Sequence, residues 1–278
     1  MAKVDKSQYS KAEWRKIREQ RRLDKQKRKE HEADPVFKEH MSLDHKPYYV
    51  LCVKNGPKYS AEYVNTLARM VERNCTVDYE FVCLTDNPEG IDDNIKVIKL
   101  PRQFRTWWAK TYMFSNQLGL KGTILYMDLD VVISGNIDRL FTYSPGNWCI
   151  IRDFTRSMRP NWQKYNSSVI RFDYNQLDHL WQDFDKKQNL YERKHYGDQD
   201  WLYAVANPKP QLWPDEWIQS WKWEIRKSRQ FAPGGTRGKR RFKDVEDVEP
   251  PEECCITVFH GDPNPELVED PWVVQNWK

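Results

Sequence analysis

The stretch TILYMDLDVVISGNID, residues 123–138, contains the pattern that decides the fold. Its first five residues read as a buried strand, and Asp128-Leu129-Asp130 follows directly. Side chains at i and i+2 point to the same side, so both carboxylates should face the crevice at the carboxyl end of a parallel strand. Two close carboxylates repel each other unless a cation lies between them, and oxygen ligands suit Mg²⁺ or Mn²⁺. This pattern predicts a cation that holds a diphosphate; a pair of solvated loop acids is the alternative.

Strand-like and helix-like segments alternate on both sides of this stretch. The first half of the body predicts strands at 48–53, 79–84, 95–100 and 123–127, and helices at 59–73 and 107–118. The second half predicts strands at 148–151, 167–172 and 255–259, and helices at 175–184 and 199–206. This rhythm indicates an α/β fold with a mainly parallel central sheet and helices on both faces.

The chain divides by charge into an arm, residues 1–46, and one body, residues 47–278. Residues 1–33 hold twelve Lys or Arg against six Asp or Glu, a formal charge of +6, whereas the remainder carries −2. The arm is expected to be a solvated helix or disordered, and an acidic partner such as nucleic acid or a membrane surface is the alternative. Within the body, residues 226–253 predict a long polar loop, which is usually functional or disordered.

Targeting signals are missing from the sequence. No apolar signal segment opens the chain, and no apolar run approaches the ~20 residues of a membrane span. The six cysteines contain no CxxC pair. These features favour a cytoplasmic, reduced protein without a transmembrane segment.

Three further sites could carry chemistry. His260 follows the apolar strand 255–259 and precedes a glycine, so its imidazole is a candidate metal ligand. Asp198 and Gln199 open a helix and could reach a sugar, although capping is the simpler role of Asp198. Lys110 lies in the helix before the Asp128 strand and could pair with phosphate, or be an ordinary surface lysine.

Taken together, these motifs resemble glycosyltransferases of the GT-A fold, and in particular the retaining, glycogenin-like family 8. The resemblance covers residues 48–278. It rests on four blocks in family order: WWAKTYMF with ILYMDLDVVISGNIDRLF, YNSSVIRFD, GDQDWLYAV, and VFHG with the later Asp270-Pro271-Trp272.

The resemblance implies a hexosyltransferase-type enzyme that uses a nucleotide-sugar, usually a UDP-sugar, with retention of configuration. Asp128, Asp130 and His260 would hold Mn²⁺ or Mg²⁺ on the donor diphosphate. The nucleotide and its phosphates would lie near Lys54, Asn55, Thr85, Asp86 and Lys110. The transferred sugar and the acceptor would face Asn166, Asp198 and Gln199.

The C-terminal block departs from the family pattern. The family usually places a phosphate-binding lysine before its Pro-Trp pair, whereas this chain has Glu269-Asp270 there. We expect basic residues of the long loop to supply the missing charge, namely Lys239, Arg240, Arg241 or Lys243.

Two other functional classes compete with the transferase. One is a nucleotide-sugar hydrolase or nucleotidyltransferase, although the short loop after residue 54 has one glycine where nucleotidyltransferases usually carry a Gly-rich loop. The other is a non-catalytic protein that binds nucleic acid or membrane through its arm. The acceptor stays open among glycan, lipid, protein and modified nucleobase. Sugar rings could stack on Trp107, Trp108, Trp213, Trp217, Trp221 and Trp223.

Overall fold

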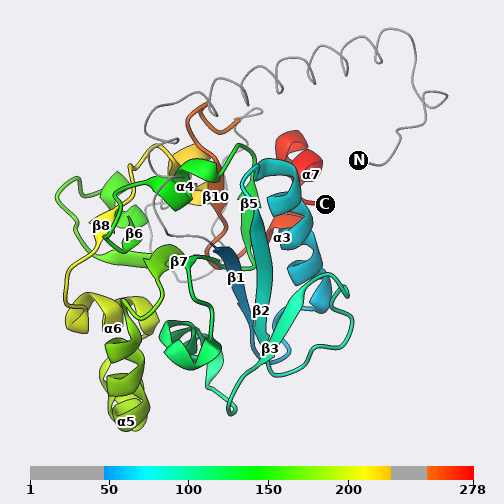
Figure 1. The fold of residues 1–278 in the computed structure, drawn as a ribbon. Helices are drawn as coiled ribbons and strands as arrows, with labels where there is room; N and C mark the ends of the chain where they lie inside the picture. Colours follow the sequence, from blue (N-terminus) through cyan, green and yellow to red (C-terminus); the bar gives the residue numbers. More distant parts are fainter. Residues whose placement is uncertain (1–46, 227–248) are drawn as a thin grey trace, which may run out of the picture. The chain divides into compact units, whose positions relative to one another are not determined.

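The computed structural model describes residues 47–226 and 249–278. The predicted arm, residues 1–46, lies outside the described residues, and so does most of the predicted polar loop, including its four candidate basic residues. The described chain forms an α/β body whose order of elements follows the predicted alternation (Figure 1).

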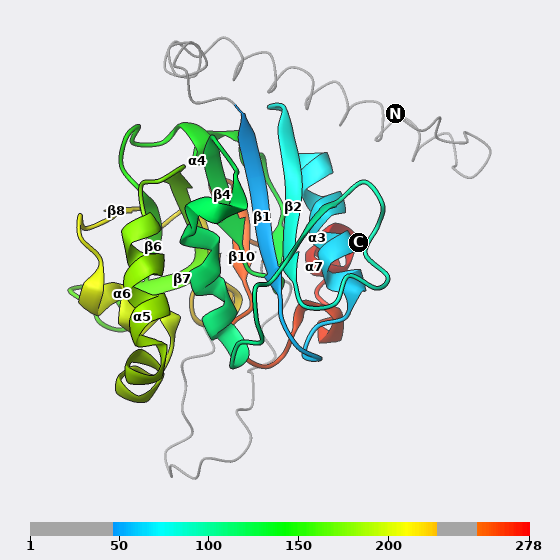
Figure 2. The ribbon, with the colours of Figure 1, turned by 60° about the horizontal axis from the view of Figure 1, so that its bottom comes forward.

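A seven-stranded sheet forms the centre of the body. Its spatial order is β3 (Lys96–Lys99), β2 (Tyr79–Thr85), β1 (Tyr48–Lys54), β4 (Thr123–Met127), β7 (Tyr165–Asp173), β6 (Cys149–Arg152) and β8 (Gln211–Leu212). All neighbours pair in parallel except β7, which runs antiparallel to both β4 and β6. The predicted, mainly parallel sheet is confirmed, and Figure 2 shows β1 and β2 side by side within it.

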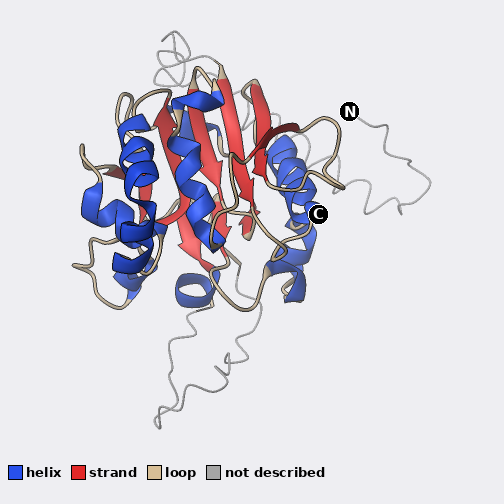
Figure 3. Cartoon of the chain, turned by 90° about the horizontal axis from the view of Figure 1, so that it is seen from below, coloured by secondary structure: helices blue, strands red, loops and turns tan. Residues whose placement is uncertain are grey.

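Helices cover both faces of this sheet (Figure 3). On one face, Tyr49 and Leu51 of β1 join a core that includes residues of three helical elements: η2 (Thr106–Phe114), α5 (Asp178–Lys194) and α6 (Asp198–Val205). On the other face, α3 (Ala61–Asn74) packs against β1 through its buried apolar stripe. Strand β1 is buried along nearly its whole length, as expected for a central strand that is covered on both faces.

A second, three-stranded sheet lies next to the predicted carboxylates. Its order is β5 (Val131–Ile133), β10 (Ile256–Val258) and β9 (Ile218–Ser220). Because β10 pairs antiparallel with β5, the chain beyond β10 returns beside Asp130, and the Phe259 amide donates to the Asp130 carbonyl at 3.0 Å. Two short helices, α4 (Asp138–Thr142) and α7 (Pro271–Asn276), complete the regular structure outside the 3₁₀ and π turns.

Two helices differ from the sequence prediction. The segment expected as one helix over 107–118 forms two 3₁₀ segments, η2 and η3 (Asn116–Leu118). Six of the nine residues of η2 are buried, so packing on several sides, rather than one apolar stripe, sets its path. The helix expected from Asn175 begins at Asp178 because Asn175 has a φ of 66°, and α5 continues to Lys194 with a break at Lys187. Among the described helices, none is long and apolar enough to cross a lipid bilayer.

Gly122 allows β4 to begin beside β1. A Cβ atom on Gly122 would lie 1.8 Å from the carbonyl oxygen of Pro47, which accepts the Thr123 amide at 3.2 Å. We expect Gly122→Ala to lower the free energy of unfolding by about 2 kcal/mol or more, because backbone atoms must move apart. Gly119→Ala is the matched control. Its Cβ would meet open space at a φ of 68°, so only a backbone strain of about 1 kcal/mol is expected. Chemical denaturation measures both variants, and equal losses would contradict the close approach at Gly122.

Candidate functional site

The predicted site residues gather where the parallel strands end. Asp128 follows β4 directly, and its amide donates to the Ser168 carbonyl of β7 at 2.8 Å. Lys110 comes from η2, and Asp198 is the first residue of α6. The end of β4 and two helical elements on one face of the sheet, η2 and α6, therefore bring three charged side chains together, at the edge where α/β sheets bind ligands.

The Lys110 ammonium is the centre of this cluster. Its Nζ lies 2.6 Å from Asp128 Oδ1, 3.8 Å from Asp198 Oδ2 and 3.4 Å from Ser167 Oγ. Burial disfavours the charged form of Lys110, but the Asp128 and Asp198 carboxylates outweigh it and raise its pKa. The lysine therefore stays protonated at neutral pH, and its side chain is partly buried, with 15 % exposed.

Asp198 contains a buried acceptor atom that lacks a hydrogen-bond donor among the described residues. The residue is buried, and its Oδ2 atom accepts no hydrogen bond from the described part of the chain, although the Lys110 ammonium faces it at 3.8 Å. Burial raises the pKa of Asp198, while Lys110 and Ser167 act in the opposite direction. A buried acceptor without a donor costs free energy, so a hydroxyl group that gained access to this solvent-closed oxygen would relieve that cost.

Asp130 lies near Asp128 but has different partners. Its Oδ2 accepts a hydrogen bond from the Tyr59 hydroxyl at 2.7 Å, and Lys58 Nζ contacts that hydroxyl at 2.7 Å. Burial and the neighbouring Asp128 carboxylate raise the pKa of Asp130 to about 6, against the effects of Tyr59 and Lys110. The Asp128 carboxylate thus acts on Asp130 as a repelling neighbour.

His260 does not join the two acids. Its Nε2 lies 2.7 Å from Ser220 Oγ, and its ring stacks on Phe154 and meets the edge of Trp223. Across residues 47–226 and 249–278, no three His, Cys, Asp or Glu side chains are grouped to hold a metal ion. The predicted set of Asp128, Asp130 and His260 is therefore not assembled, because hydrogen bonding and ring packing hold the imidazole elsewhere while its main chain runs beside Asp130.

The residues predicted near the nucleotide connect the loops after β1 and β2. Lys54 Nζ donates to the Asn87 carbonyl at 3.1 Å, and both Asp86 carboxylate oxygens accept from the Gly56 amide. Asn55 Nδ2 donates to the Phe104 and Thr106 carbonyls at 3.1 and 2.9 Å. The Thr85 hydroxyl donates to the Asn87 carbonyl at 3.0 Å. These four side chains thus hold the loops after β1 and β2 and the segment before η2 together.

Gln199, Asn166 and the tryptophans are the remaining residues that the sequence predicted for the site. Gln199 is half-buried beside Asp198 on the first turn of α6. The Asn166 side chain is buried and accepts from the Ser168 amide at 3.0 Å, whereas its neighbour Ser167 reaches Lys110. Of the six tryptophans considered for stacking, Trp108, Trp213 and Trp221 are buried in the body, and Trp107 is the most exposed at 42 %.

Sequence reasoning missed four side chains of this site. Ser167 touches Lys110, and the buried Tyr126 donates its hydroxyl hydrogen to Asp128. Strand periodicity could have identified Tyr126, because residues 126 and 128 share a side. Lys58 and Tyr59 carry no comparable signal, since they lie about seventy residues before the acid that they reach.

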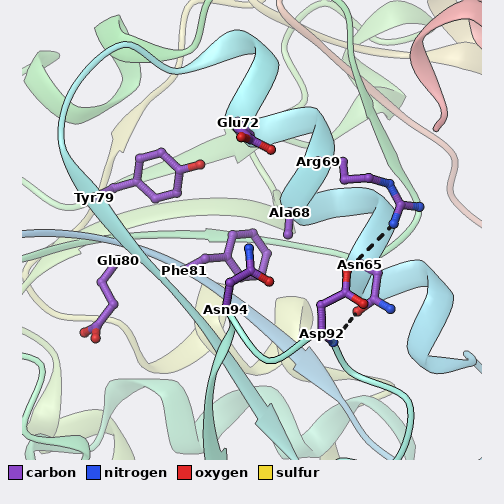
Figure 4. Close-up of a pocket in the computed structure, with 9 residues that line it drawn as sticks. All are labelled: Asn65, Ala68, Arg69, Glu72, Tyr79, Glu80, Phe81, Asp92 and Asn94. Atoms are coloured by element: carbon purple, nitrogen blue, oxygen red, sulfur yellow. Dashed lines mark hydrogen bonds and ion pairs between the residues drawn. The ribbon is translucent and has the colours of Figure 1, made fainter. Parts of the chain in front are cut away.

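The cavity in Figure 4 is separate from this cluster. It has a volume of about 330 Å³ and lies between α3 and the start of β2, where Asn65, Arg69 and Tyr79 are among its lining residues. The candidate site lies at the opposite, carboxyl end of the same strand, next to Thr85. We therefore assign the candidate site to the charged cluster and not to this cavity.

Known proteins resemble this chain in structure and not in sequence. No protein-family model matches it, and no curated protein matches it. The solved galactosyltransferase LgtC, in complex with donor and acceptor sugar analogues, aligns with a TM-score of 0.55 at 15% identity, over 80% of this chain and 91% of its own. The glycosyltransferase GlyE of Streptococcus pneumoniae TIGR4 aligns with a TM-score of 0.56 at 14% identity, over 79% of this chain and 56% of its own.

The bifunctional glycosyltransferase WbbM aligns with a TM-score of 0.51 at 11% identity, over 85% of this chain and 52% of its own. The chain thus spans about half the length of the GlyE and WbbM chains. These alignments confirm that the chain has the GT-A glycosyltransferase fold that its motifs predicted.

The raised pKa of Asp130 predicts a pH-dependent cost in stability. Ionising this buried acid costs free energy in the folded protein, so the native state loses stability as pH rises from about 4 through the folded pKa of about 6. We expect Asp130→Asn, without divalent metal, to be more stable than the wild type at pH 7.5 by on the order of 1–3 kcal/mol. At pH 4 the two proteins should be equally stable.

Thermal unfolding across this pH range measures the difference. The variant of an exposed acid, Asp93→Asn, controls for the loss of one surface charge and should show no such trend. A difference between wild type and Asp130→Asn that does not change with pH would contradict the prediction.

Proposed function

We propose that this chain is a glycosyltransferase that moves a sugar from a nucleotide-sugar donor, with UDP as the carrier, to an acceptor. The observation that carries the proposal is the Lys110, Asp128 and Asp198 cluster at the carboxyl ends of the strands. The fold supports it, because LgtC, which has the same fold, is a galactosyltransferase solved with donor and acceptor sugar analogues. Phosphate binding and sugar binding are assigned to different members of the cluster.

The donor phosphates would lie against Lys110. Its protonated ammonium offers charge to an anion, and the Asp128 and Asp198 carboxylates orient it. A cation fixed before the reaction stabilises negative charge that grows on the leaving diphosphate, without the cost of reorganising solvent.

The sugar would lie between Lys110 and the first turn of α6. Asp198 Oδ2 is suited to a sugar hydroxyl because it accepts no hydrogen bond from the described residues. Gln199 lies next to it, and a Gln-to-Glu exchange in LgtC is described as an active-site mutant. With Asn166 at the start of β7, these side chains would orient the sugar and the acceptor for transfer with retention.

A divalent cation, Mn²⁺ or Mg²⁺, fits the two acids of this site. Asp128 and Asp198 pair with the Lys110 ammonium, and Asp130 adds a third carboxylate next to Asp128. Three carboxylates against one ammonium repel a diphosphate unless further positive charge enters. When bound, the cation would neutralise charge on the leaving diphosphate. Asp128 and Asp130 would hold it, and His260 would join them by leaving Ser220.

Replacing Lys110 tests the phosphate assignment. We expect Lys110→Met to lower kcat/KM for donor turnover by about 100-fold or more, because a preorganised charge is lost at the leaving group. The control is Lys121→Met. Lys121 is exposed and lies just before the first residue of β4, so turnover by this variant should equal that of the wild type.

The assay is hydrolysis and transfer with a panel of UDP-sugars, such as UDP-glucose, UDP-galactose and UDP-N-acetylglucosamine, with and without Mn²⁺. Lys110→Arg keeps the charge and should retain part of the rate, which separates loss of charge from loss of folding. Unchanged turnover in Lys110→Met would refute the assignment, and no turnover of any donor by the wild type would refute the proposed function.

Metal binding tests the acid pair and His260 separately. We expect Mn²⁺ to bind the wild type in the presence of UDP and Asp130→Asn to lose this binding, measured by electron paramagnetic resonance of free Mn²⁺. His260→Ala should weaken binding by about 10–100-fold if the imidazole is a ligand, as expected for loss of a group that supports a metal site. The exposed His179→Ala is its control. Equal affinity of His260→Ala and wild type would exclude His260 from the ligand set.

A further inference from the structure

A second cavity lies beyond the reaction centre on the α6 side of the sheet. It has a volume of about 390 Å³ and is lined by Gln163, Tyr165, Tyr203, Lys209, Pro210 and Leu212. These residues come from the segment before β7, from the start of β7, from α6, and from the chain around β8. None of them has a role in the chemistry proposed above.

Two tyrosine rings form the walls of this cavity. Tyr165 is buried, whereas Tyr203 is 39 % exposed, and their ring centroids are 5.1 Å apart at an interplanar angle of 72°. Lys209 Nζ donates to the Tyr203 carbonyl at 3.1 Å and lies 5.7 Å from the centre of the Tyr203 ring. One ring is thus partly open to solvent, and an ammonium is fixed beside it.

The lining chemistry suits a neutral, hydroxyl-rich molecule. Aromatic faces pack against the C–H faces of a sugar, and the Gln163 amide and the two phenol hydroxyls can exchange hydrogen bonds with its hydroxyl groups. Lys209 is the one charged residue in the lining, so the cavity lacks the several cations that bind polyphosphates or nucleic acid. Its polar groups also make it a poor site for a lipid chain.

Strand β7 links the cavity to the reaction centre. Its residue Tyr165 contacts Tyr203 in the cavity wall, and Ser167, two residues later, contacts Lys110. Gln163 precedes Asn166 by three residues, and Lys164 Nζ pairs with Asp200 Oδ1 at 3.5 Å between the start of β7 and α6. A sugar chain whose reacting end lies at the Lys110 cluster could therefore extend past the start of β7 to Tyr203.

We propose that this cavity is a remote subsite for an oligosaccharide acceptor, which binds a sugar unit away from the reacting end. The inference rests on the proposed transferase function, and it selects a glycan from the four acceptor classes that the sequence left open. It assigns Tyr203 as the stacking platform and Gln163 with Lys209 as hydrogen-bonding partners.

Binding of oligosaccharides to the full chain tests the subsite. The probes are malto-, cello- and laminari-oligosaccharides and N-acetyllactosamine chains, each from one to four units, titrated by calorimetry in the presence of UDP. We expect chains of three or four units to bind more tightly than the monosaccharides. Tyr203→Ala should weaken their binding about tenfold and leave UDP affinity and donor hydrolysis unchanged.

Two further variants make the result specific. Tyr203→Phe keeps the ring and should keep most of the affinity, which separates stacking from a general loss of folding. Tyr174→Ala replaces a partly exposed tyrosine just after the far end of β7 and should behave as wild type.

The outcomes separate the subsite from the enzyme. Equal affinity of Tyr203→Ala and wild type for the longer chains, or no binding of any chain in the panel, would overturn the subsite. In that case, donor hydrolysis that continues would leave the proposed function intact. Oligosaccharide binding that depends on Tyr203, in a protein that turns over no donor, would keep the subsite and overturn the transferase.

Discussion

One partly buried cation, the ammonium of Lys110, holds the site together. Its contacts join η2 to the end of β4 and to the first turn of α6. A lysine enclosed in this way is costly unless carboxylates compensate it, and carboxylates enclosed in this way are costly without the lysine. Charge balance therefore favours the convergence of these three elements at one point.

Uncharged hydroxyl groups also form hydrogen bonds with the charged side chains of the cluster. The Tyr126 hydroxyl donates to Asp128, and Ser167 contributes its hydroxyl to Lys110 from the antiparallel strand β7. Because β7 runs against β4, its first residues lie beside the last residues of β4, and the amide of Asp128 bonds to Ser168. Strand β7, the antiparallel strand of the seven-stranded sheet, thus supplies polar groups to an edge that otherwise receives the carboxyl ends of parallel strands.

The sequence allowed much of this to be predicted, for physical reasons that differ between residues. Asp128 and Asp130 were identifiable because a predicted buried strand precedes them. Asp198 was identifiable because it opens a predicted helix, and Lys110 because it lies in the helix predicted before the Asp128 strand. The direction of the His260 side chain could not be predicted, because the residues that contact it, Ser220, Phe154 and Trp223, come from distant parts of the chain. Tyr59 could not be found either, because its contact with Asp130 arises only when α3 packs beside the sheet.

The two acids of the D-x-D segment are compensated unequally, and this difference bears on where a metal would bind. Asp128 has the Lys110 cation at 2.6 Å, whereas Asp130 has the neutral Tyr59 hydroxyl at 2.7 Å. A hydrogen bond from a neutral donor stabilises a carboxylate without cancelling its charge. Asp130 therefore carries the less compensated charge, and a divalent cation would be drawn to this acid. Together with Lys110, such a cation would supply the positive charge that a leaving diphosphate needs.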